Sequence, residues 1–348
     1  MGEQETEQTA RDWWIYRGSG TPHGGIDDLP EAPAWRAFDE FSEEELMAPP
    51  GDDAPAATAR RLGRAHQATA YQADDKEIEL VNLALHLRRP LLITGKPGVG
   101  KSTLAYAVAH ELKLGHVLRW PITSRSTLRD GLYAYDAIGR LHDAGIKDPT
   151  DTKNEPSIGH YLRLGPLGTA LLPWHRPRVL LIDEIDKSDV DLPNDLLNVF
   201  EEGEYEIPEL ARLGPDAQDV MTSDHEGKAR VKGGRVRCAQ FPFVVLTSNA
   251  EREFPTAFLR RCVRLEVQPP DEHRLAAMVA AHLGGNTATA SLRTELITDF
   301  LRRQREEGAA LANDQLLNAL LMAERGLWDN EAGRELIHKV LLRPLTDG

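Results

Sequence analysis

The sequence predicts an α/β fold in which a parallel sheet lies between layers of helices, followed by a small all-helical domain. From Lys76 onward, short apolar runs alternate with segments of helical periodicity. After QPPDE at 268–272, only helical segments follow. The 348 residues, 41% of them hydrophobic, can build a sizeable core and about two domains.

Residues 1–75 are predicted to form an acidic, largely extended arm. Residues 1–60 hold 14 acidic and 4 basic residues, so most of the net charge of −14 lies there and does not argue against a nucleic-acid partner. Four aromatic residues in the arm are too apolar to remain in solvent: Trp13, Trp14, Tyr16 and Trp35. We expect them to dock on the globular body or on a neighbouring subunit; a partner-binding peptide is the alternative.

Residues 76–268 are predicted to form the α/β domain. Helical periodicity appears at 76–89 and 102–112, and short apolar runs typical of buried parallel strands occur at 90–94, 116–122, 178–183 and 241–248. Such alternation implies a parallel sheet covered on both faces by helices. Residues 269–348 are predicted to form a helical domain, with segments near 271–283, 291–306, 313–325 and 330–342.

Composition excludes several classes of protein. No apolar run approaches the roughly 18 residues that a membrane span needs, and the acidic N-terminal segment does not resemble a signal peptide. We therefore expect a cytoplasmic protein without a membrane partner. Cys238 and Cys262 are far apart and predict reduced, buried thiols, and no histidine spacing indicates a transition-metal site.

A phosphate-binding motif follows the first apolar run. Residues 95–102 fit GxxxxGK[ST], between a predicted strand and a predicted helix. Glycines let backbone N–H groups approach a β-phosphate, and the helix N-terminus favours the same charge. Lys101 would reach the β- and γ-phosphates of ATP, and Ser102 would ligate Mg²⁺. The predicted nucleotide-binding residues are Gly95, Lys96, Pro97, Gly98, Val99, Gly100, Lys101, Ser102 and Thr103.

An acidic pair ends the apolar run at 179–182. Asp183 and Glu184 would lie at the carboxyl edge of the sheet, where ligands bind in such folds. Asp183 is predicted to hold Mg²⁺ together with Ser102, and Glu184 to polarise the attacking water. A surface acidic loop is the alternative interpretation.

Two further segments contain candidate catalytic residues. The run at 241–248 ends in Ser248 and Asn249, and the amide of Asn249 could orient the water or contact the γ-phosphate. Arg260 and Arg261 precede another apolar strand and are candidate arginine fingers for a neighbouring subunit's nucleotide, with ordinary solvated arginines as the alternative.

In this order, GKPGVGKS, LLIDEID, the Asn of LTSN and the Arg pair of AFLRRC resemble the AAA+ ATPases over roughly residues 76–348. Residues 165–207, from GPLGTALL to EGEYEI, are similar to the MoxR type. The resemblance implies a P-loop NTPase with a helical lid, assembled in a ring of usually six subunits. ATP would lie between subunits, with arginines supplied in trans. It also implies remodelling or loading of partner proteins, often beside von Willebrand factor A-type proteins.

Three features qualify the resemblance. The long spacing from Lys101 to Asp183 fits an insertion around Thr127–Ser157, and the spacing from Asp183 to Asn249 fits a hairpin before the Asn-bearing strand. The family's usual arginine at the start of the third lid helix is missing, because residues 308–322 contain no basic residue. Arg302, Arg303 or Arg305 could substitute for it.

A basic hairpin is predicted at 228–237. KARVKGGRVR alternates around Gly-Gly, which sets Lys232 opposite Arg235 and Arg230 opposite Arg237 on one face. Like charges facing each other destabilise a hairpin, so this face should attract anions. A solvated edge paired with carboxylates and a contact with an acidic protein or nucleic acid both remain open.

These observations predict a MoxR-like AAA+ ATPase that hydrolyses ATP with Mg²⁺ to remodel or activate a client protein. Two alternatives remain at this point. The basic hairpin suggests a nucleic-acid-dependent ATPase or restriction-type translocase subunit, although no DNA-binding module is recognisable. The acidic arm and the missing lid arginine suggest an ATP-binding switch or scaffold with little turnover.

Overall fold

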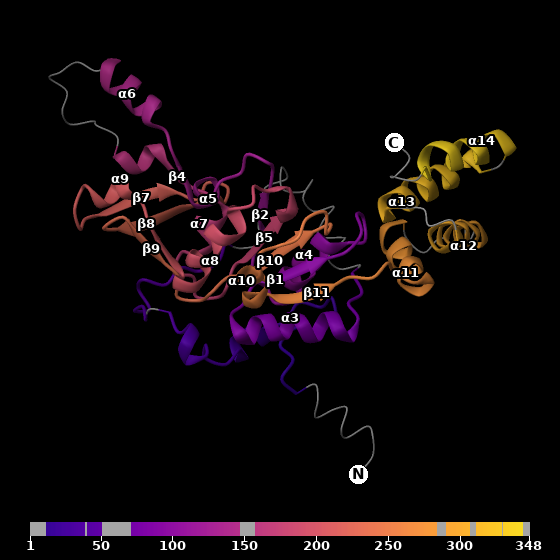
Figure 1. The fold of residues 1–348 in the computed structure, drawn as a ribbon, viewed down its shortest axis with the longest axis horizontal. Helices are drawn as coiled ribbons and strands as arrows, with labels where there is room; N and C mark the ends of the chain where they lie inside the picture. The colour runs from indigo at the N-terminus through magenta and orange to yellow at the C-terminus, as the bar shows by residue number, and fades with distance from the viewer. Residues whose placement is uncertain are drawn as a thin grey trace, which may run out of the picture.

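Five parallel strands form the central sheet of the computed structural model, which describes residues 12–38, 40–50, 71–146, 157–283, 290–306, 311–328 and 330–343 (Figure 1). Their spatial order is β11-β1-β10-β5-β2. The strands are β1 (Leu91–Thr94), β2 (Leu118–Pro121), β5 (Val179–Asp183), β10 (Phe243–Ser248) and β11 (Val263–Glu266). All four pairings are parallel, so the predicted α/β fold and its strands are confirmed.

Helices cover both faces of this sheet because the strand residues alternate between two apolar clusters. Helices α3 (Asp75–Leu87) and α4 (Lys101–Glu111) pack on the face that carries Ile93 and Leu181. The opposite face, with Leu92 and Ile182, packs against α7 (Pro166–Ala170), α8 (Leu192–Glu202) and α10 (Thr256–Arg261). Burying apolar strands on both faces is what a parallel sheet requires.

A second sheet of six strands was not predicted beyond its hairpin. Its order is β3-β4-β7-β8-β9-β6. The strands are β3 (Tyr133–Tyr135), β4 (Leu162–Leu164), β6 (Glu204–Glu206), β7 (Ala217–Met221), β8 (Lys228–Lys232) and β9 (Arg235–Arg237). Most of them are only three residues long, which is too short for a clear alternation in the sequence. The predicted pairing of Lys232 with Arg235 is present.

The expected insertion around 127–157 departs from the sheet as α5 (Leu128–Leu132), β3 and α6 (Ala137–Ile146), and residues 147–156 lie outside the described part. Helix α6 projects from the body (Figure 1). Short helical elements complete this half: η4 (Ile158–Tyr161), η5 (Ile185–Lys187) and α9 (Pro208–Ala211). Both cysteines, Cys238 and Cys262, are free and buried, as predicted.

The described part of the N-terminal arm docks on α3 and α4. It contains two 3-10 turns, η1 (Gly25–Asp28) and η2 (Ala34–Arg36). The buried Asn82 side chain accepts hydrogen bonds from the backbone of Ile15 and Tyr16 at 2.7 and 2.9 Å. Tyr16 is fully buried, whereas Trp35 is 77% exposed. Tyr16 and Trp14 therefore dock on the body as expected, whereas Trp35 does not, and its docking on a neighbouring subunit stays a prediction.

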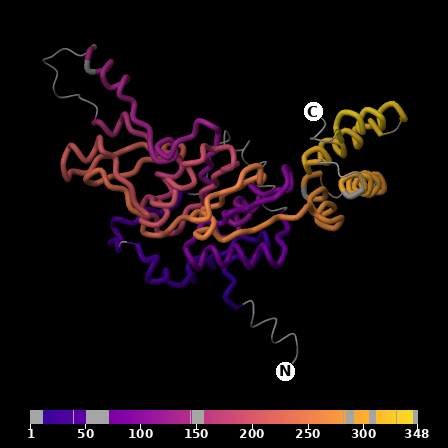
Figure 2. Tube along the Cα trace, in the orientation of Figure 1, coloured from indigo at the N-terminus to yellow at the C-terminus, as the bar shows by residue number. Residues whose placement is uncertain are grey.

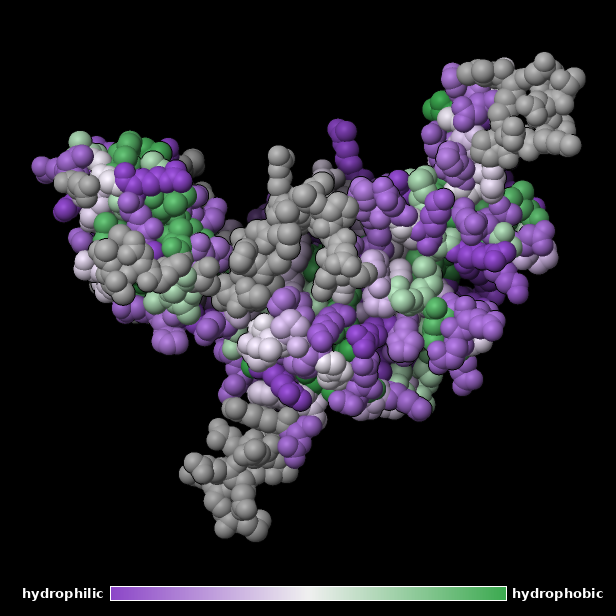
Figure 3. Space-filling model, turned by 180° about the vertical axis from the view of Figure 1, so that it is seen from behind, coloured by the Kyte–Doolittle hydropathy of each residue, from purple (hydrophilic) through white to green (hydrophobic). Residues whose placement is uncertain are grey.

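The C-terminal helices form a lid with an apolar core of its own. They are α11 (Glu272–Leu283), α12 (Ala290–Glu306), α13 (Asn313–Met322), η7 (Ala323–Leu327), α14 (Glu331–Leu336) and η8 (Ile337–Leu341). Leu275, Phe300 and Leu316 are fully buried in this core. The chain after β11 leads into the lid, which stands beside the body as a separate lobe (Figures 2 and 3). Within the described ranges, no helix has the length and apolar character needed to cross a membrane.

Candidate active site

A cavity of about 590 Å³ lies between the carboxyl edge of the central sheet and the lid. The body contributes the loop before α4 and the ends of three strands, and the lid contributes residues of α11 and α13. The predicted site residues that line the cavity are Pro97, Gly98, Val99, Gly100, Lys101, Ser102, Thr103, Asp183, Glu184 and Asn249. Candidate catalytic and metal-binding residues from three separate segments therefore meet in one place: Lys101 and Ser102, Asp183 and Glu184, and Asn249.

The loop between β1 and α4 forms the phosphate cradle. Gly98 and Gly100 have φ values of +76° and +97°, a left-handed conformation that glycine adopts without strain. The Nζ of Lys101 donates hydrogen bonds to the carbonyl oxygens of Gly95 and Lys96 at 2.7 and 2.9 Å, and to Asn249 Oδ1 at 2.7 Å. Burial lowers the pKa of Lys101, against the opposing effect of the nearby carboxylates. An anionic phosphate would compensate that buried charge.

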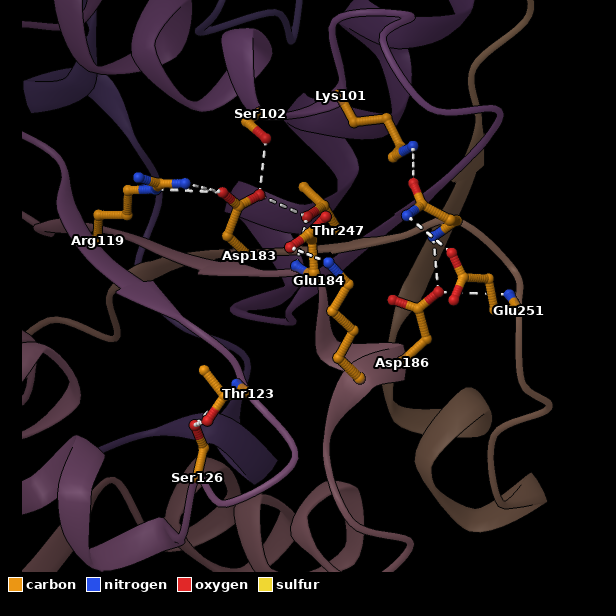
Figure 4. Close-up of polar contacts among 12 residues, drawn as sticks. Lys101, Ser102, Arg119, Thr123, Ser126, Asp183, Glu184, Asp186, Thr247 and Glu251 are labelled. Carbon is orange, nitrogen blue, oxygen red and sulfur yellow. Dashed lines mark hydrogen bonds and ion pairs between the residues drawn. The ribbon is translucent and has the colours of Figure 1, made fainter. Parts of the chain in front are cut away.

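Asp183 is the centre of the polar network in Figure 4. Its Oδ1 accepts hydrogen bonds from Ser102 Oγ at 2.7 Å and from Thr247 Oγ1 at 2.8 Å. Its Oδ2 accepts from Arg119 Nε and Nη2 at 3.1 and 2.6 Å. Burial acts to raise the pKa of Asp183, but the hydrogen bonds from these three side chains outweigh it, so the pKa lies below its usual value. The pairing of a hydroxyl with an ionised carboxylate beside the cradle is a donor set of hard oxygens that fits Mg²⁺.

Glu184 adopts a left-handed conformation, with φ of +62°, directly after β5. Its backbone N–H donates to Thr247 Oγ1 at 2.9 Å, which fixes the turn. Its carboxylate lines the cavity and forms an ion pair with Lys187 Nζ at 2.8 Å. Because both side chains of this pair are more than 40% exposed, the pair is weak and the carboxylate is free to exchange partners.

Asp186 shapes the loop that carries Asn249. Its buried Oδ2 accepts hydrogen bonds from the backbone N–H groups of Asn249 and Glu251 at 2.8 and 3.3 Å. Ala250, between them, has φ of +61°, a conformation that costs a non-glycine residue about 1 kcal/mol. The two hydrogen bonds hold the loop in this conformation, and the Asn249 amide consequently meets Lys101.

Arg260 and Arg261 lie apart from this cavity, exposed at the C-terminal end of α10. The Arg261 guanidinium pairs with Glu201 of α8. The Arg260 side chain has no hydrogen-bond or ion-pair partner within the described part of the chain. Neither arginine lines the cavity of its own chain.

The lid presents a different arginine from those considered in the sequence. Arg302 and Arg303 pair with Asp299 of their own helix and do not line the cavity, and the Arg305 side chain lies outside the described residues. Arg274 of α11 lines the cavity instead, with its Nη2 bonded to the buried Glu77 carboxylate at 3.0 Å. The arginine that the lid contributes to the cavity therefore lies in the first lid helix, α11.

Four residues of the site were not predicted from the sequence: Arg119, Asp186, Thr247 and Arg274. Alternation could have found two of them. Thr247 lies in β10, next to its carboxyl end and two residues before Asn249, and alternation along that strand separates it from Ser248. In β2, the alternation of buried and exposed residues puts Arg119 on the face of Leu181 and Asp183. Asp186 and Arg274 carry no such signal, because their partners come from distant segments.

The basic hairpin is paired with acids of its own sheet. Arg230 lies opposite Asp219, Arg235 opposite Glu206 and Arg237 opposite Glu204 in the strand registers. Arg235 Nη2 also forms an ion pair with Glu204 at 2.8 Å. Opposite charges across strands are stabilising, so the anions that the hairpin attracts come from its neighbouring strands.

The strand order, the phosphate cradle and the acidic strand end define an AAA+ P-loop ATPase, which is an ATP-hydrolysing enzyme. Residues 90–262 match the family model described as the AAA domain of the dynein-related subfamily. The matched segment is just under half of the chain.

Solved structures of RuvB proteins are similar to this chain. A variant RuvB chain from Thermotoga maritima is similar over 77% of this chain and 69% of that chain, with 14% identity and a TM-score of 0.40. The Thermotoga maritima RuvB Holliday junction branch migration motor is similar over 75% of this chain and 67% of that chain, with 14% identity and a TM-score of 0.38. No curated protein matches the sequence.

Proposed function

We propose that this chain is a MoxR-like AAA+ ATPase that hydrolyses Mg²⁺-bound ATP to remodel or activate a partner protein. The observation that supports this best is the convergence of Lys101, Ser102, Asp183, Glu184 and Asn249 on one cavity. The segment that resembles the MoxR type, residues 165–207, contains both the acidic strand end and α8.

Each of these residues has a distinct role in the proposed reaction. The backbone N–H groups of the cradle and Lys101 hold the β- and γ-phosphates. Ser102 and Asp183 would hold Mg²⁺, which neutralises charge on the phosphate oxygens when it is bound. Glu184 accepts a proton from the attacking water once its carboxylate leaves Lys187, and Asn249 orients that water or the γ-phosphate.

The catalytic site requires a second copy of the chain in this proposal. Arg260 and Arg261 are exposed and do not line their own cavity, so they are available to act on a neighbour's nucleotide. Of the two, Arg260 is the better candidate, because Arg261 already pairs with Glu201. A closed ring, usually of six subunits in similar proteins, would supply one arginine to every site and bind ATP at each subunit interface.

The client is proposed from the resemblance to the MoxR type. It is a protein or adaptor, and proteins with von Willebrand factor A-type domains are the first class to examine. Trp35, 77% exposed on the arm, is one apolar contact point available to a neighbouring subunit or partner. Closure of the interface around ATP would transmit force to such a client.

The decisive experiment replaces the proposed water-polarising carboxylate. A Glu184→Gln variant should bind ATP with unchanged affinity, hydrolyse it at least about a hundredfold more slowly, and retain its assembled state and partner. Glu253→Gln, an exposed acid near the same loop, is the matched control and should behave as wild type. Hydrolysis by Glu184→Gln at the wild-type rate would refute the assignment.

A further inference from the structure

Arg119 reaches the metal-binding carboxylate from an edge strand. It lies in β2, which pairs only with β5 in the sheet, and its register partner is Leu181. Alternation along parallel strands puts Arg119, Leu181 and Asp183 on one face. This face is the one covered by α4, the helix that carries Ser102. The guanidinium therefore approaches Asp183 on the same side of the sheet as the proposed magnesium ligands (Figure 4).

The two oxygens of Asp183 are divided between different partners. Oδ1 accepts from the hydroxyls of Ser102 and Thr247, and Oδ2 accepts from two nitrogens of Arg119. Hydrogen bonds between a guanidinium and an ionised carboxylate are charge-assisted and stronger than neutral ones. The Asp183 side chain is only 10% exposed, so its charge is poorly solvated and depends on a nearby cation. A divalent ion that needed Oδ2, directly or through a bound water, would meet the guanidinium there.

The two partners differ in solvent exposure and in the contacts that hold them. The Arg119 side chain is 40% exposed, whereas Asp183 is 10% exposed and also accepts hydrogen bonds from two hydroxyls. Arg119 can consequently swing into solvent while Asp183 stays in position. A buried arginine fixed by several acceptors could not be displaced in this way, as the fully buried Arg178 beside Asp224 illustrates.

We propose that Arg119 is an internal counter-ion that competes with the divalent cation for Asp183. The inference rests on the proposed assignment of Ser102 and Asp183 as magnesium ligands. The guanidinium neutralises the carboxylate when no metal is bound, and it leaves Oδ2 when the metal arrives with its nucleotide. Arg119 thereby sets the affinity for the metal and makes tight binding depend on the extra ligands that the phosphates provide.

The test measures metal binding and not turnover. Free Mn²⁺ is titrated against the full-length protein and followed by its electron paramagnetic resonance signal, with and without ADP. Arg119→Met, which keeps an unbranched apolar stem but removes the guanidinium and its charge, should bind Mn²⁺ about tenfold more tightly without ADP, because a like charge next to the metal is removed. Arg119→Lys should remain near wild type.

Controls separate competition from damage to the fold. Arg176→Met removes an arginine that donates two hydrogen bonds to the Asp27 carboxylate, away from the site, and should leave Mn²⁺ affinity unchanged. Arg119→Gln repeats the neutral substitution with a polar side chain, should Arg119→Met not fold. Mn²⁺ should also raise the melting temperature of the neutral variants more than that of wild type.

Two failures would be distinguishable. Unchanged or weaker Mn²⁺ binding in both neutral variants would overturn the competition and leave Arg119 with a purely structural role. Wild type and Asp183→Asn binding Mn²⁺–ADP equally well would instead refute the proposed metal site on which the inference rests.

Discussion

The Nζ of Lys101 donates a hydrogen bond to Asn249 Oδ1 at 2.7 Å, which joins the first residue of α4 to the loop after β10. The same ammonium group is bonded to two carbonyl oxygens of the cradle. Asn249 is therefore positioned at the point where Lys101 would meet the terminal phosphates.

We expect Asn249→Ala to reduce steady-state turnover by about tenfold to a hundredfold while ATP affinity changes by less than about threefold. The amide orients reacting groups, whereas binding depends mainly on the cradle and Lys101. Turnover and nucleotide titration on the same preparation measure the two effects. Asn194→Ala, at an exposed position of α8, is the control. An unchanged turnover would remove Asn249 from the reaction.

The assignment of Arg260 to a neighbouring subunit's site can be tested by mixing two inactive variants. Arg260→Ala should bind ATP normally and lose most of its turnover, because its own cavity is intact but its neighbour lacks the arginine. Glu184→Gln keeps the arginine and lacks the water-polarising carboxylate. Mixed assemblies contain interfaces with one intact contribution from each variant, so we expect turnover to reappear. Failure of every mixing ratio to restore activity would contradict catalysis in trans by Arg260.

The contact between Gly98 and the lid predicts that a single methyl group added at Gly98 strongly weakens ATP binding. A Cβ at Gly98 would lie 2.3 Å from Ala312 Cβ and 2.7 Å from its Cα, and φ is +76°. Gly98→Ala should therefore push the lid from the cradle and weaken ATP binding by more than about tenfold. Gly214→Ala, where φ is +96° and no atom lies within 4 Å, isolates the backbone cost and should lower only stability, by about 1 kcal/mol. Equal effects of both variants on ATP affinity would refute the lid contact.

The buried ion pair between Arg178 and Asp224 predicts a large loss of stability on breaking it. Two hydrogen bonds of 2.9 and 2.8 Å join the side chains, which are 0% and 4% exposed. Asp224→Ala leaves an uncompensated buried charge and should lower the free energy of unfolding by about 3–5 kcal/mol. Urea unfolding measures this value. Asp27→Ala, which breaks the exposed pair with Arg176, should cost less than about 1 kcal/mol.

The carboxylates that face the basic hairpin predict that nucleic acid does not activate this enzyme. Turnover at low salt should be the same with and without single-stranded DNA, duplex DNA or RNA, because Arg230, Arg235 and Arg237 each face a carboxylate across the sheet. Stimulation that disappears in the Arg230→Ala, Arg237→Ala double variant would contradict this and favour the restriction-type translocase interpretation.

Local patterns in the sequence were sufficient for much of the fold and part of the site. The five apolar runs became the parallel strands because each is short, continuous and bounded by helical segments. The cradle and the Asp183–Glu184 pair were readable because their spacing and the flanking elements are themselves the signal. The second sheet was missed, except for its hairpin, because three-residue strands gain their stability from their neighbours and leave no periodicity of their own.

By itself, the sequence determined the chemistry that is encoded in contiguous residues: the glycine-rich loop, the acids that end β5 and the alternation of strands and helices. Only the tertiary structure decided which distant side chains complete the site. Arg119 reaches Asp183, Asp186 holds the loop of Asn249, and Arg274 of the first lid helix lines the cavity. The physical reason is that hydrogen bonds and ion pairs depend on distances of about 3 Å between side chains, and these arise only when separate strands and helices pack together.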